Sequence, residues 1–206
     1  MLSKDRIHEL LQGFISEETM SEELLAALES YLALLCRWNV KVNLTAVRDP
    51  EAMVRRHFGE SLFAAQKILA AGEPASVMDI GSGPGFPGIP VKLLIPAAQT
   101  TLIEAKAKKA TFLREVIRAL HLTGIAVQEG RAESTAAQAE VVTLRAVELF
   151  ETIAPVARGH VKQGGRLVLL IGSAQVTRAS EILGKEPEKV DEIPESAARV
   201  VAQWTF

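Results

Sequence analysis

The stretch with the clearest chemical potential is a glycine-rich run, Asp79–Gly88 (DIGSGPGFPG), which continues a short apolar segment. Glycine lets a chain turn sharply and brings its backbone close to a ligand. In parallel α/β sheets, ligands bind beyond the carboxyl ends of the strands. The run therefore predicts a cofactor-binding turn. It is not a dinucleotide fingerprint, because Phe86 stands where the third glycine is required, and no Gly-Lys-Ser/Thr follows as a P-loop needs.

What remains is a Gly-x-Gly-x-Gly pattern preceded by Asp79, which resembles the first motif of class I methyltransferases. That resemblance implies S-adenosylmethionine as the cofactor. Glu104 ends the next apolar segment, where a carboxylate can accept two hydrogen bonds from ribose hydroxyls. The loop Glu129–Glu133 follows the third segment, and in this fold it faces the adenine; taken alone, it reads as a loop with solvated charges.

The elements that must position these residues alternate from Ala75 onward, and we expect short strands separated by helices. One helix carries Phe112 to Leu120, with Gly124 as its stop. A segment without polar alternation predicts a strand buried on both faces. The expected strands are 77–80, 100–104, 125–127, 141–144 and the fully buried 166–171, with an edge strand in the tail, 199–206.

Residues 1–72 read as helical. Apolar residues recur at helical spacing from Ile7 to Phe14, and a second helix begins at Ser21, a favourable N-cap. A third helix begins at Asp49 and Pro50, since aspartate caps and proline suits the first helical position, and runs to Leu69. We expect residues 1–72 to pack as an extension on a cofactor-binding domain formed by residues 73–206.

Composition limits the classes that remain. The net charge of −2 excludes a globally basic nucleic-acid footprint, so an RNA partner requires a local patch. The N-terminus does not read as a signal peptide, and no apolar run approaches the roughly 20 residues that span a bilayer. The single cysteine, Cys36, fits the reducing cytoplasm and leaves no disulfide or zinc cluster to expect. No metal, membrane association or obligate protein partner is expected.

Several segments together resemble a known family, the bacterial 16S rRNA guanine-N7 methyltransferases (RsmG, also called GidB). They are Trp38–Thr45 (WNVKVNLT), Arg56–Leu62 (RHFGESL), Asp79–Pro90 (DIGSGPGFPGIP), Gly130–Glu133 (GRAE) and Arg145–Ala146. The resemblance implies an α/β class I methyltransferase, Rossmann-like, with a mostly parallel seven-stranded sheet and a helical N-terminal extension. It also implies N7 methylation of a guanine in 16S rRNA of the small ribosomal subunit. One departure is Thr143-Leu144 before Arg145, where the family usually places a small hydroxyl residue beside the arginine.

The predicted site residues follow from the turn and the resemblance together. The cofactor contacts expected are Gly81, Ser82, Gly83, Phe86, Glu104, Ala132, Glu133 and Arg145. Lysines at the start of a helix are disfavoured by its dipole, so their placement there indicates use in phosphate binding. The RNA contacts expected are Arg55, Arg56, Lys106, Lys108 and Lys109, although a solvated face is the alternative for the lysines.

The chemistry is compatible with guanine N7, whose lone pair needs no general base. Arg145 is the candidate to orient the base through guanine O6, or to orient the cofactor; the alternative is an ion pair with a nearby carboxylate such as Glu148. No Asn/Asp-Pro-Pro-aromatic loop for exocyclic amines follows strand 141–144, and Cys36 stands too early for pyrimidine chemistry. Asn39, Asn43 and His57 are candidates for substrate or packing roles.

Other functions stay open on the residues alone. They are a methyltransferase acting on another RNA or a small molecule, a non-catalytic RNA-binding module, and a nicotinamide-dependent oxidoreductase. The glycine spacing at Phe86 argues against the oxidoreductase, and the intact turn with Glu104 argues against the binding module.

Overall fold

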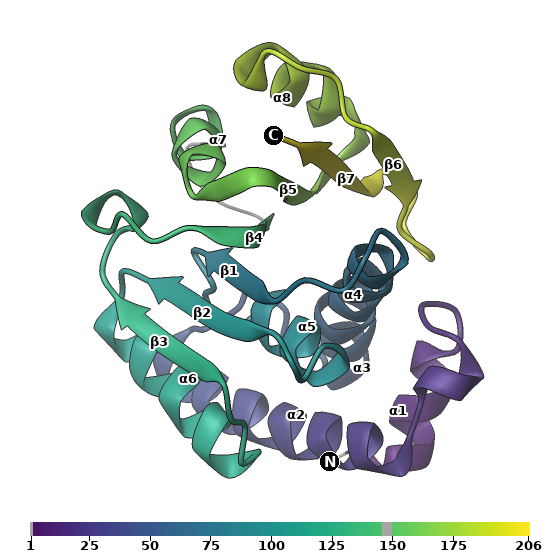
Figure 1. Ribbon diagram of the computed structural model, residues 1–206. Coiled ribbons are helices and arrows are strands. Elements are labelled where there is room, and N and C mark those ends of the chain that lie inside the picture. The colour runs from purple at the N-terminus through teal and green to yellow at the C-terminus, as the bar shows by residue number, and fades with distance from the viewer. Residues whose placement is uncertain (1, 146–149) are drawn as a thin grey trace.

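A seven-stranded sheet forms the centre of the computed structural model, which describes residues 2–145 and 150–206 (Figure 1). The strand order is β3-β2-β1-β4-β5-β7-β6, and the first five are parallel neighbours. Their bounds are β1 Ser76–Ile80, β2 Gln99–Glu104, β3 Ile125–Glu129, β4 Ala139–Arg145, β5 Val161–Gly172, β6 Lys189–Glu192 and β7 Arg199–Thr205. The Rossmann-like, mostly parallel seven-stranded architecture is therefore confirmed.

The C-terminal strand corrects one prediction. β7 pairs antiparallel with β5 on one side and β6 on the other, so it is an interior strand and not an edge. The edge is β6, which the sequence pattern did not reveal. Three of its four residues, Lys189–Glu192, are charged and the strand is mostly exposed, as expected of a short strand that faces solvent at a sheet edge.

The two faces of the sheet are covered by different helices. One face packs against α5 (Gly88–Leu94), α6 (Ala107–Ala119) and the N-terminal helices, in a core to which Val77, Val141 and Val168 contribute. The opposite face packs against α7 (Phe150–Gly159) and α8 (Val176–Leu183), with Met78 and Val142 in its core. Neighbouring strand residues thus enter opposite cores, because side chains alternate along a strand.

The N-terminal helices follow the predicted boundaries closely. They are α1 Lys4–Leu11, α2 Glu22–Val42, α3 Pro50–Met53 and α4 Glu60–Ala70, with a short 3₁₀ turn, η1, at Glu17–Thr19. Ser21 accepts a hydrogen bond from the Leu24 backbone N–H and Asp49 from that of Ala52, so both predicted N-caps are present. The third predicted helix is interrupted by a π-helical turn, η2 (Val54–Gly59), which the periodicity did not indicate. Such turns occur often at functional sites.

The predicted stop of the helix after β2 was wrong. α6 ends at Ala119, and the left-handed position that terminates it is occupied by His121, with φ of 51°. The Leu122 N–H returns to the Ile117 carbonyl, as in a Schellman motif. Gly124, with φ of 63°, instead begins the approach to β3. Short 3₁₀ turns also occur at Ala132–Ser134 and Ser173–Gln175.

The segment around residue 72, between the N-terminal helices and β1, contacts the sheet directly. Arg166 of β5 donates to the carbonyls of Ile68 and Gly72, at 2.9 and 2.6 Å. Residues of α1, α2 and α4 share one hydrophobic core with the sheet. No helix among the described residues combines the length and the apolar character needed to cross a bilayer.

Candidate active site

A cavity of about 360 Å³ lies beyond the carboxyl ends of β1, β2 and β3. It is lined by Ile80, Gly81, Ile103, Ala105, Gly130, Arg131, Ala132, Glu133, Thr152 and Ile153. Three predicted cofactor contacts, Gly81, Ala132 and Glu133, thus lie together although two of them come from a distant loop. Its apolar walls and its place beyond the strand ends suit a nucleoside. We name it the cofactor cavity.

The glycine-rich turn beside this cavity is held by Glu104. One carboxylate oxygen accepts from the Gly83 N–H at 2.8 Å, and the other accepts from the Lys106 N–H at 2.7 Å. Ser82 turns inward, and its hydroxyl donates to the Asp79 carbonyl at 3.0 Å. Gly81 and Gly83 have positive φ values of 69° and 56°, a conformation that glycine adopts without strain. Each carboxylate oxygen retains a further lone pair for a ligand.

Asp79 fastens the turn to the sheet from inside. Its side chain is fully buried, accepts from the Thr143 hydroxyl at 2.7 Å and from the Gly88 N–H at 3.1 Å, and joins β1, β4 and α5. Burial raises the pKa of this carboxyl to about 6 in spite of these hydrogen bonds. The hydroxyl of Thr143, two residues before Arg145, therefore serves as a partner of Asp79.

Phe86 occupies an aromatic cluster and its ring is not among the residues lining the cofactor cavity. The ring stacks on Tyr31 at a centroid distance of 5.3 Å and on His57 at 5.1 Å. Tyr31, a buried residue of α2, also donates to the Pro84 carbonyl. The Phe86 side chain thus packs against residues of the N-terminal helices, and the predicted cofactor contact at Phe86 stays a prediction. The sequence could not reveal this packing, which joins Phe86 to residues 29 and 55 positions away.

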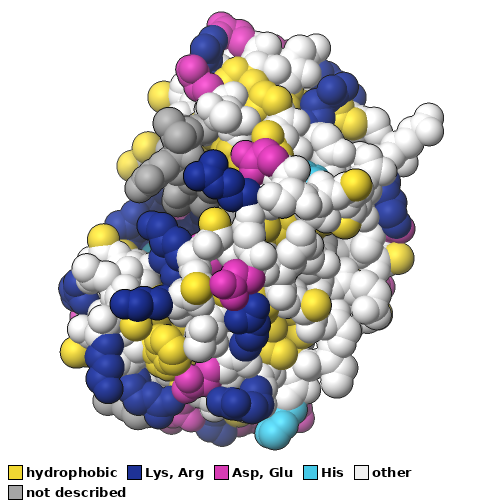
Figure 2. Space-filling view, turned by 90° about the vertical axis from the view of Figure 1, so that its left-hand side faces the viewer, with side chains coloured by type: hydrophobic (Ala, Val, Ile, Leu, Met, Phe, Trp, Pro, Cys, Tyr) yellow, Lys and Arg dark blue, Asp and Glu magenta, His cyan; other side chains and the backbone are white. Residues whose placement is uncertain are grey.

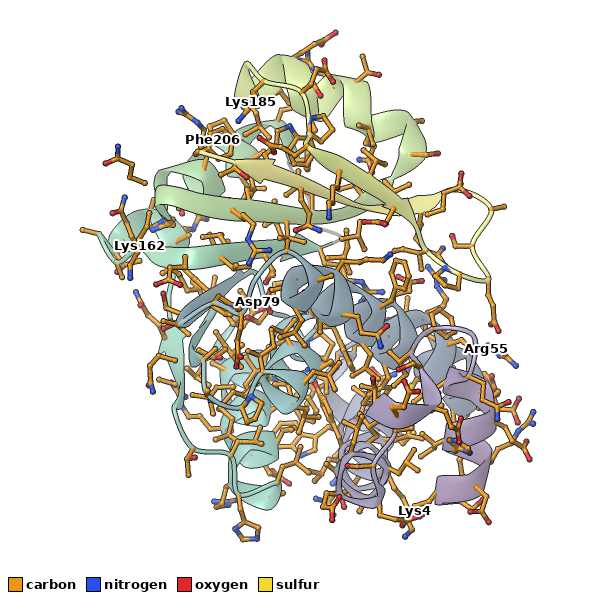
Figure 3. All side chains as sticks on the ribbon, turned by 45° about the vertical axis from the view of Figure 1, so that its right-hand side comes forward. Lys4, Arg55, Asp79, Lys162, Lys185 and Phe206 are labelled. Carbon is orange, nitrogen blue, oxygen red and sulfur yellow. The ribbon has the colours of Figure 1, made fainter. Side chains whose placement is uncertain are left out.

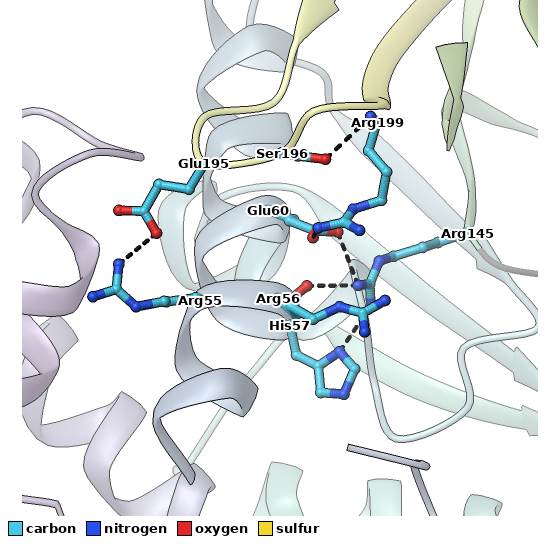
Figure 4. Close-up of polar contacts among 8 residues, drawn as sticks. All are labelled: Arg55, Arg56, His57, Glu60, Arg145, Glu195, Ser196 and Arg199. Carbon is cyan, nitrogen blue, oxygen red and sulfur yellow. Dashed lines mark hydrogen bonds and ion pairs between the residues drawn. The ribbon is translucent and has the colours of Figure 1, made fainter. Parts of the chain in front are cut away.

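Arg145 ends β4 at a second cavity of about 210 Å³, which we name the arginine cavity. It is lined by Arg56, Glu60, Leu144, Arg145, Phe150, Leu170, Ile171, Gly172, Gln175, Ile193 and Arg199. The Arg145 guanidinium donates to His57 Nδ1 at 3.2 Å, to the Arg56 carbonyl at 2.6 Å and to Glu60 at 3.0 Å (Figure 4). All three partners come from η2 and the start of α4, and Glu148, the partner considered from sequence, lies outside the described residues.

Glu60 is the residue that sequence reasoning missed. It is only 2% exposed, yet its two oxygens pair with Arg145 at 3.0 Å and with Arg199 at 2.6 Å. With Arg56 on the rim, three cations and one carboxylate line the arginine cavity among the residues that the structure describes, so this part of the lining is net positive. Sequence offered only a weak signal, the position of Glu60 in the RHFGES segment, because the ion pairs join residues 85 and 139 positions away.

His57 is held as a neutral imidazole. It is 8% exposed, and burial, together with the charges of Arg145 and Arg56, lowers its pKa to about 3. Since Nδ1 accepts from Arg145, Nε2 carries the proton and donates to Thr45 Oγ1 at 2.8 Å. The Thr45 N–H in turn donates to Asn39 Oδ1 at 2.9 Å.

Asn43 does not belong to that chain of hydrogen bonds. It caps α2 in the left-handed conformation, and its side chain accepts from Arg48. Cys36 is also distant from the strand ends; it lies half-buried in α2 with its sulfur 3.9 Å from that of Met53. Neither residue lines the cofactor cavity or the arginine cavity.

The predicted RNA contacts separate into two groups. Lys106, Lys108 and Lys109 lie at the start of α6 beside the glycine-rich turn, and a Cβ on Gly83 would stand 3.9 Å from Lys109 Nζ. Arg56 is exposed at the arginine cavity, but Arg55 is paired with Glu195 and lies at the periphery, away from Asp79 (Figures 3 and 4). Lysine and arginine side chains are numerous on the face shown in Figure 2. Within residues 2–145 and 150–206, no three side chains form a metal-binding group.

Solved structures establish the kind of fold that carries these cavities. The chain is similar to a ribosomal protein L11 methylase from Lactobacillus delbrueckii subsp. bulgaricus, with a TM-score of 0.62 and 15% identity over 73% of this chain and 79% of that one. It is also similar to a SAM-dependent methyltransferase from Aquifex aeolicus, with a TM-score of 0.59 and 15% identity over 78% and 96% of the two chains. At this identity the likeness shows the fold, the class I methyltransferase fold.

Sequence relatives are more specific. Two proteins named ribosomal RNA small subunit methyltransferase G match this chain. The one from Chloroflexus aggregans is 41% identical over 81% of this chain and 74% of its own length, and the one from Xylella fastidiosa is 45% identical over 70% and 67%. The family model described as rRNA small subunit methyltransferase G matches residues 24–194, which include the glycine-rich turn, Glu60 and Arg145. The chain is therefore a member of the rRNA small subunit methyltransferase G family.

Proposed function

We propose that the protein transfers the methyl group of S-adenosylmethionine to N7 of a guanine in the 16S rRNA of the small ribosomal subunit. The observation that carries this proposal is the juxtaposition of a nucleoside-sized cavity and an arginine-lined cavity at the ends of neighbouring strands, in a chain of this family. In this proposal, residues 1–72 form a helical extension. It contributes Arg56 and Glu60 to the arginine cavity and packs Tyr31 and His57 against Phe86 of the glycine-rich turn.

The cofactor cavity suits the adenosine part of S-adenosylmethionine. Ile103 and Ala132 provide apolar contact for a purine, and Glu104 offers its remaining lone pairs to the ribose hydroxyls. Gly81 and Gly83 let the backbone approach the amino-acid part of the cofactor closely. When bound, the cofactor supplies an already activated methyl group, so the protein mainly has to align donor and acceptor.

The arginine cavity suits a guanine that reacts at N7. The Arg145 guanidinium has five N–H donors, and three of them bond to His57, Arg56 and Glu60 among the described residues. A bidentate arginine on O6 and N7 would block the reacting lone pair, whereas one remaining donor on O6 leaves N7 free. Arg145 therefore orients the base through O6.

The reaction needs no general base. The N7 lone pair forms the new bond to carbon, the carbon–sulfur bond breaks towards sulfur, and no proton leaves the guanine. Asp79 is buried behind the glycine-rich turn, Glu60 is paired with two arginines, and both ring nitrogens of His57 are occupied. These groups position other side chains and do not face an acceptor proton.

The lysines at the start of α6 and Arg56 are proposed to contact RNA phosphates beside the target base. An assembled or partly assembled small subunit is the proposed form of the substrate, because a chain with net charge −2 gains little from non-specific attraction to free RNA.

Methyl transfer can be tested on small ribosomal subunits from a strain lacking this gene, incubated with methyl-labelled S-adenosylmethionine. The expected result is label in 16S rRNA and strand scission at one guanine after reduction and aniline treatment. Label at a position that resists scission would leave a methyltransferase with a different acceptor atom. No label, with cofactor binding intact, would overturn the substrate.

A further inference from the structure

We propose that His57 is a positioning residue for methyl transfer, a neutral imidazole that sets the direction of the Arg145 guanidinium towards the target base. The inference rests on the proposed function, since it assigns a role within the same site. It concerns a side chain that is not itself among the residues lining either cavity and that acts through Arg145, which lines the arginine cavity.

Both terminal nitrogens of the Arg145 guanidinium make hydrogen bonds, each with different partners. Nη2 donates both of its hydrogens, one to Glu60 and one to the Arg56 carbonyl. These two contacts hold one end of the guanidinium. The contact from Nη1 to His57 Nδ1, at 3.2 Å, holds a second nitrogen of the planar group and so adds to its orientation. One Nη1–H and the Nε–H then remain as donors for a base.

The protonation of His57 is fixed from its other side. Thr45 Oγ1 lies 2.8 Å from Nε2, and the Val47 N–H donates to the same oxygen at 3.2 Å. Asn39 holds this loop by accepting from the Thr45 N–H and donating to the Val47 carbonyl. Segments 39–47 and 54–60 therefore cooperate to present an acceptor, and not a donor, to Arg145.

The ring is also fixed against the glycine-rich turn. It stacks on Phe86 at 5.1 Å with an interplanar angle of 24°, and Phe86 is part of the turn that borders the cofactor cavity. His57 thus touches both the turn and Arg145. The charged groups around it are Arg145, Arg56 and Glu60; an imidazolium here would face two arginines, and the lowered pKa agrees with the neutral form that the geometry requires.

The experiment compares variants on the same subunits used to test the function. His57→Phe keeps the ring on Phe86 and removes the acceptor; His57→Asn restores an acceptor near the position of Nδ1. We expect His57→Phe to lower kcat about 10-fold or more, with KM for small subunits and cofactor affinity within about 2-fold, and His57→Asn to recover most of kcat. Thr45→Val, which frees Nε2, is expected to lower kcat about 3-fold.

His160 provides the matched control. It is also a buried histidine, 6% exposed and bonded to the Ala137 carbonyl at 2.7 Å, but it lies at the opposite, amino end of β5. His160→Phe is expected to keep the wild-type kcat. In an Arg145→Ala background, adding His57→Phe is expected to cause no further loss, because the two residues act as one unit.

The outcomes separate the inference from the proposed function. If the wild type does not methylate guanine N7 in small subunits, the proposed function fails. If it does and His57→Phe retains the wild-type kcat, the inference alone is overturned. It is also overturned if His57→Phe lowers the rate of the Arg145→Ala protein by the same factor as that of the wild type. If His57→Phe does not fold, the proposal is tested with His57→Asn and Thr45→Val instead. A wild-type kcat in Thr45→Val then contradicts the proposal.

Discussion

The two cavities at the carboxyl ends of the strands are built differently. The cofactor cavity is formed mainly by the ends of β1, β2 and β3 and the loops that follow them, with Thr152 and Ile153 of α7 on one side. Glu104 secures the glycine-rich turn from the end of the adjacent strand. The arginine cavity is formed by side chains from η2, α4, β4, β5 and β7, joined by the ion pairs of Glu60. The first depends on local backbone geometry, and the second depends on charges brought together from across the chain.

This difference predicts different sensitivities. A substitution in the cofactor cavity should weaken cofactor binding and leave the fold intact. A substitution in the arginine cavity should disturb folding or catalysis, because its charged groups are buried and few of them can be removed without leaving another unpaired.

The largest effect is expected at Glu60. Glu60→Gln leaves Arg145 and Arg199 without their shared carboxylate, and removing one member of a buried ion pair costs about 3 kcal/mol of unfolding free energy. Denaturant unfolding measures this loss. Glu9→Gln, which breaks the exposed pair with Arg6, is the control and should change stability by less than about 1 kcal/mol. Equal stability of the two variants would show that the Glu60 network contributes nothing to folding.

Arg145→Lys comes next. Lysine keeps the charge but cannot reach His57, Arg56 and Glu60 at once, so kcat should fall roughly 100-fold, as for removal of a preorganised donor. Cofactor affinity, measured by calorimetry, should change less than about 3-fold. Arg114→Lys, at an exposed ion pair with Glu129, should transfer methyl groups normally. A large loss of cofactor affinity in Arg145→Lys would show that Arg145 contacts the cofactor and would contradict its assignment to the base.

The pH dependence of stability isolates His57. Its pKa is about 3 in the folded protein and near 6.5 when unfolded, so between these values the unfolded chain binds a proton that the folded chain does not. Stability from this group is present above pH 6.5 and is lost as the pH falls. From pH 6.5 to 5 the wild type should lose about 2 kcal/mol more than His57→Asn. Parallel stability curves for the two proteins would mean that His57 is not held neutral.

Glu104→Gln tests the cofactor cavity. An amide has one oxygen for the two backbone N–H groups of Gly83 and Lys106, and it accepts weaker hydrogen bonds from a ribose. Affinity for S-adenosylmethionine should fall about 10-fold, with the unfolding midpoint little changed. Glu181→Gln, at an exposed ion pair with Arg178 on α8, should bind the cofactor as the wild type does. Unchanged affinity in Glu104→Gln would remove Glu104 from the cofactor site.

The smallest effect concerns the lysines at the start of α6. Neutralising Lys108 and Lys109 should reduce the slope of log affinity against log salt for RNA binding by about 1.5, since each lost phosphate contact removes somewhat less than one unit. Lys162→Gln, near the amino end of β5, is the control. A slope equal to the wild type's would leave these lysines as a solvated face.

Sequence predicted what is local. The turn after β1, the N-caps Ser21 and Asp49 and the alternation of strands with helices all follow from neighbouring residues, and they are present. Prediction from the sequence failed for features that depend on contacts between distant segments of the chain. The π-helical turn η2 and the interior position of β7 depend on packing, and the double ion pair of Glu60 joins three separate segments. No pattern within one segment encodes such contacts.

The proposal that the cofactor cavity binds S-adenosylmethionine and the arginine cavity binds the target base is tested most directly by a crystal structure of the protein with S-adenosylhomocysteine. The account predicts adenine between Ile103 and Ala132, ribose hydroxyls on Glu104, and the sulfur directed towards the arginine cavity with Arg145 still bonded to His57. A cofactor whose sulfur points away from Arg145, or whose ribose lies elsewhere than at Glu104, would contradict it.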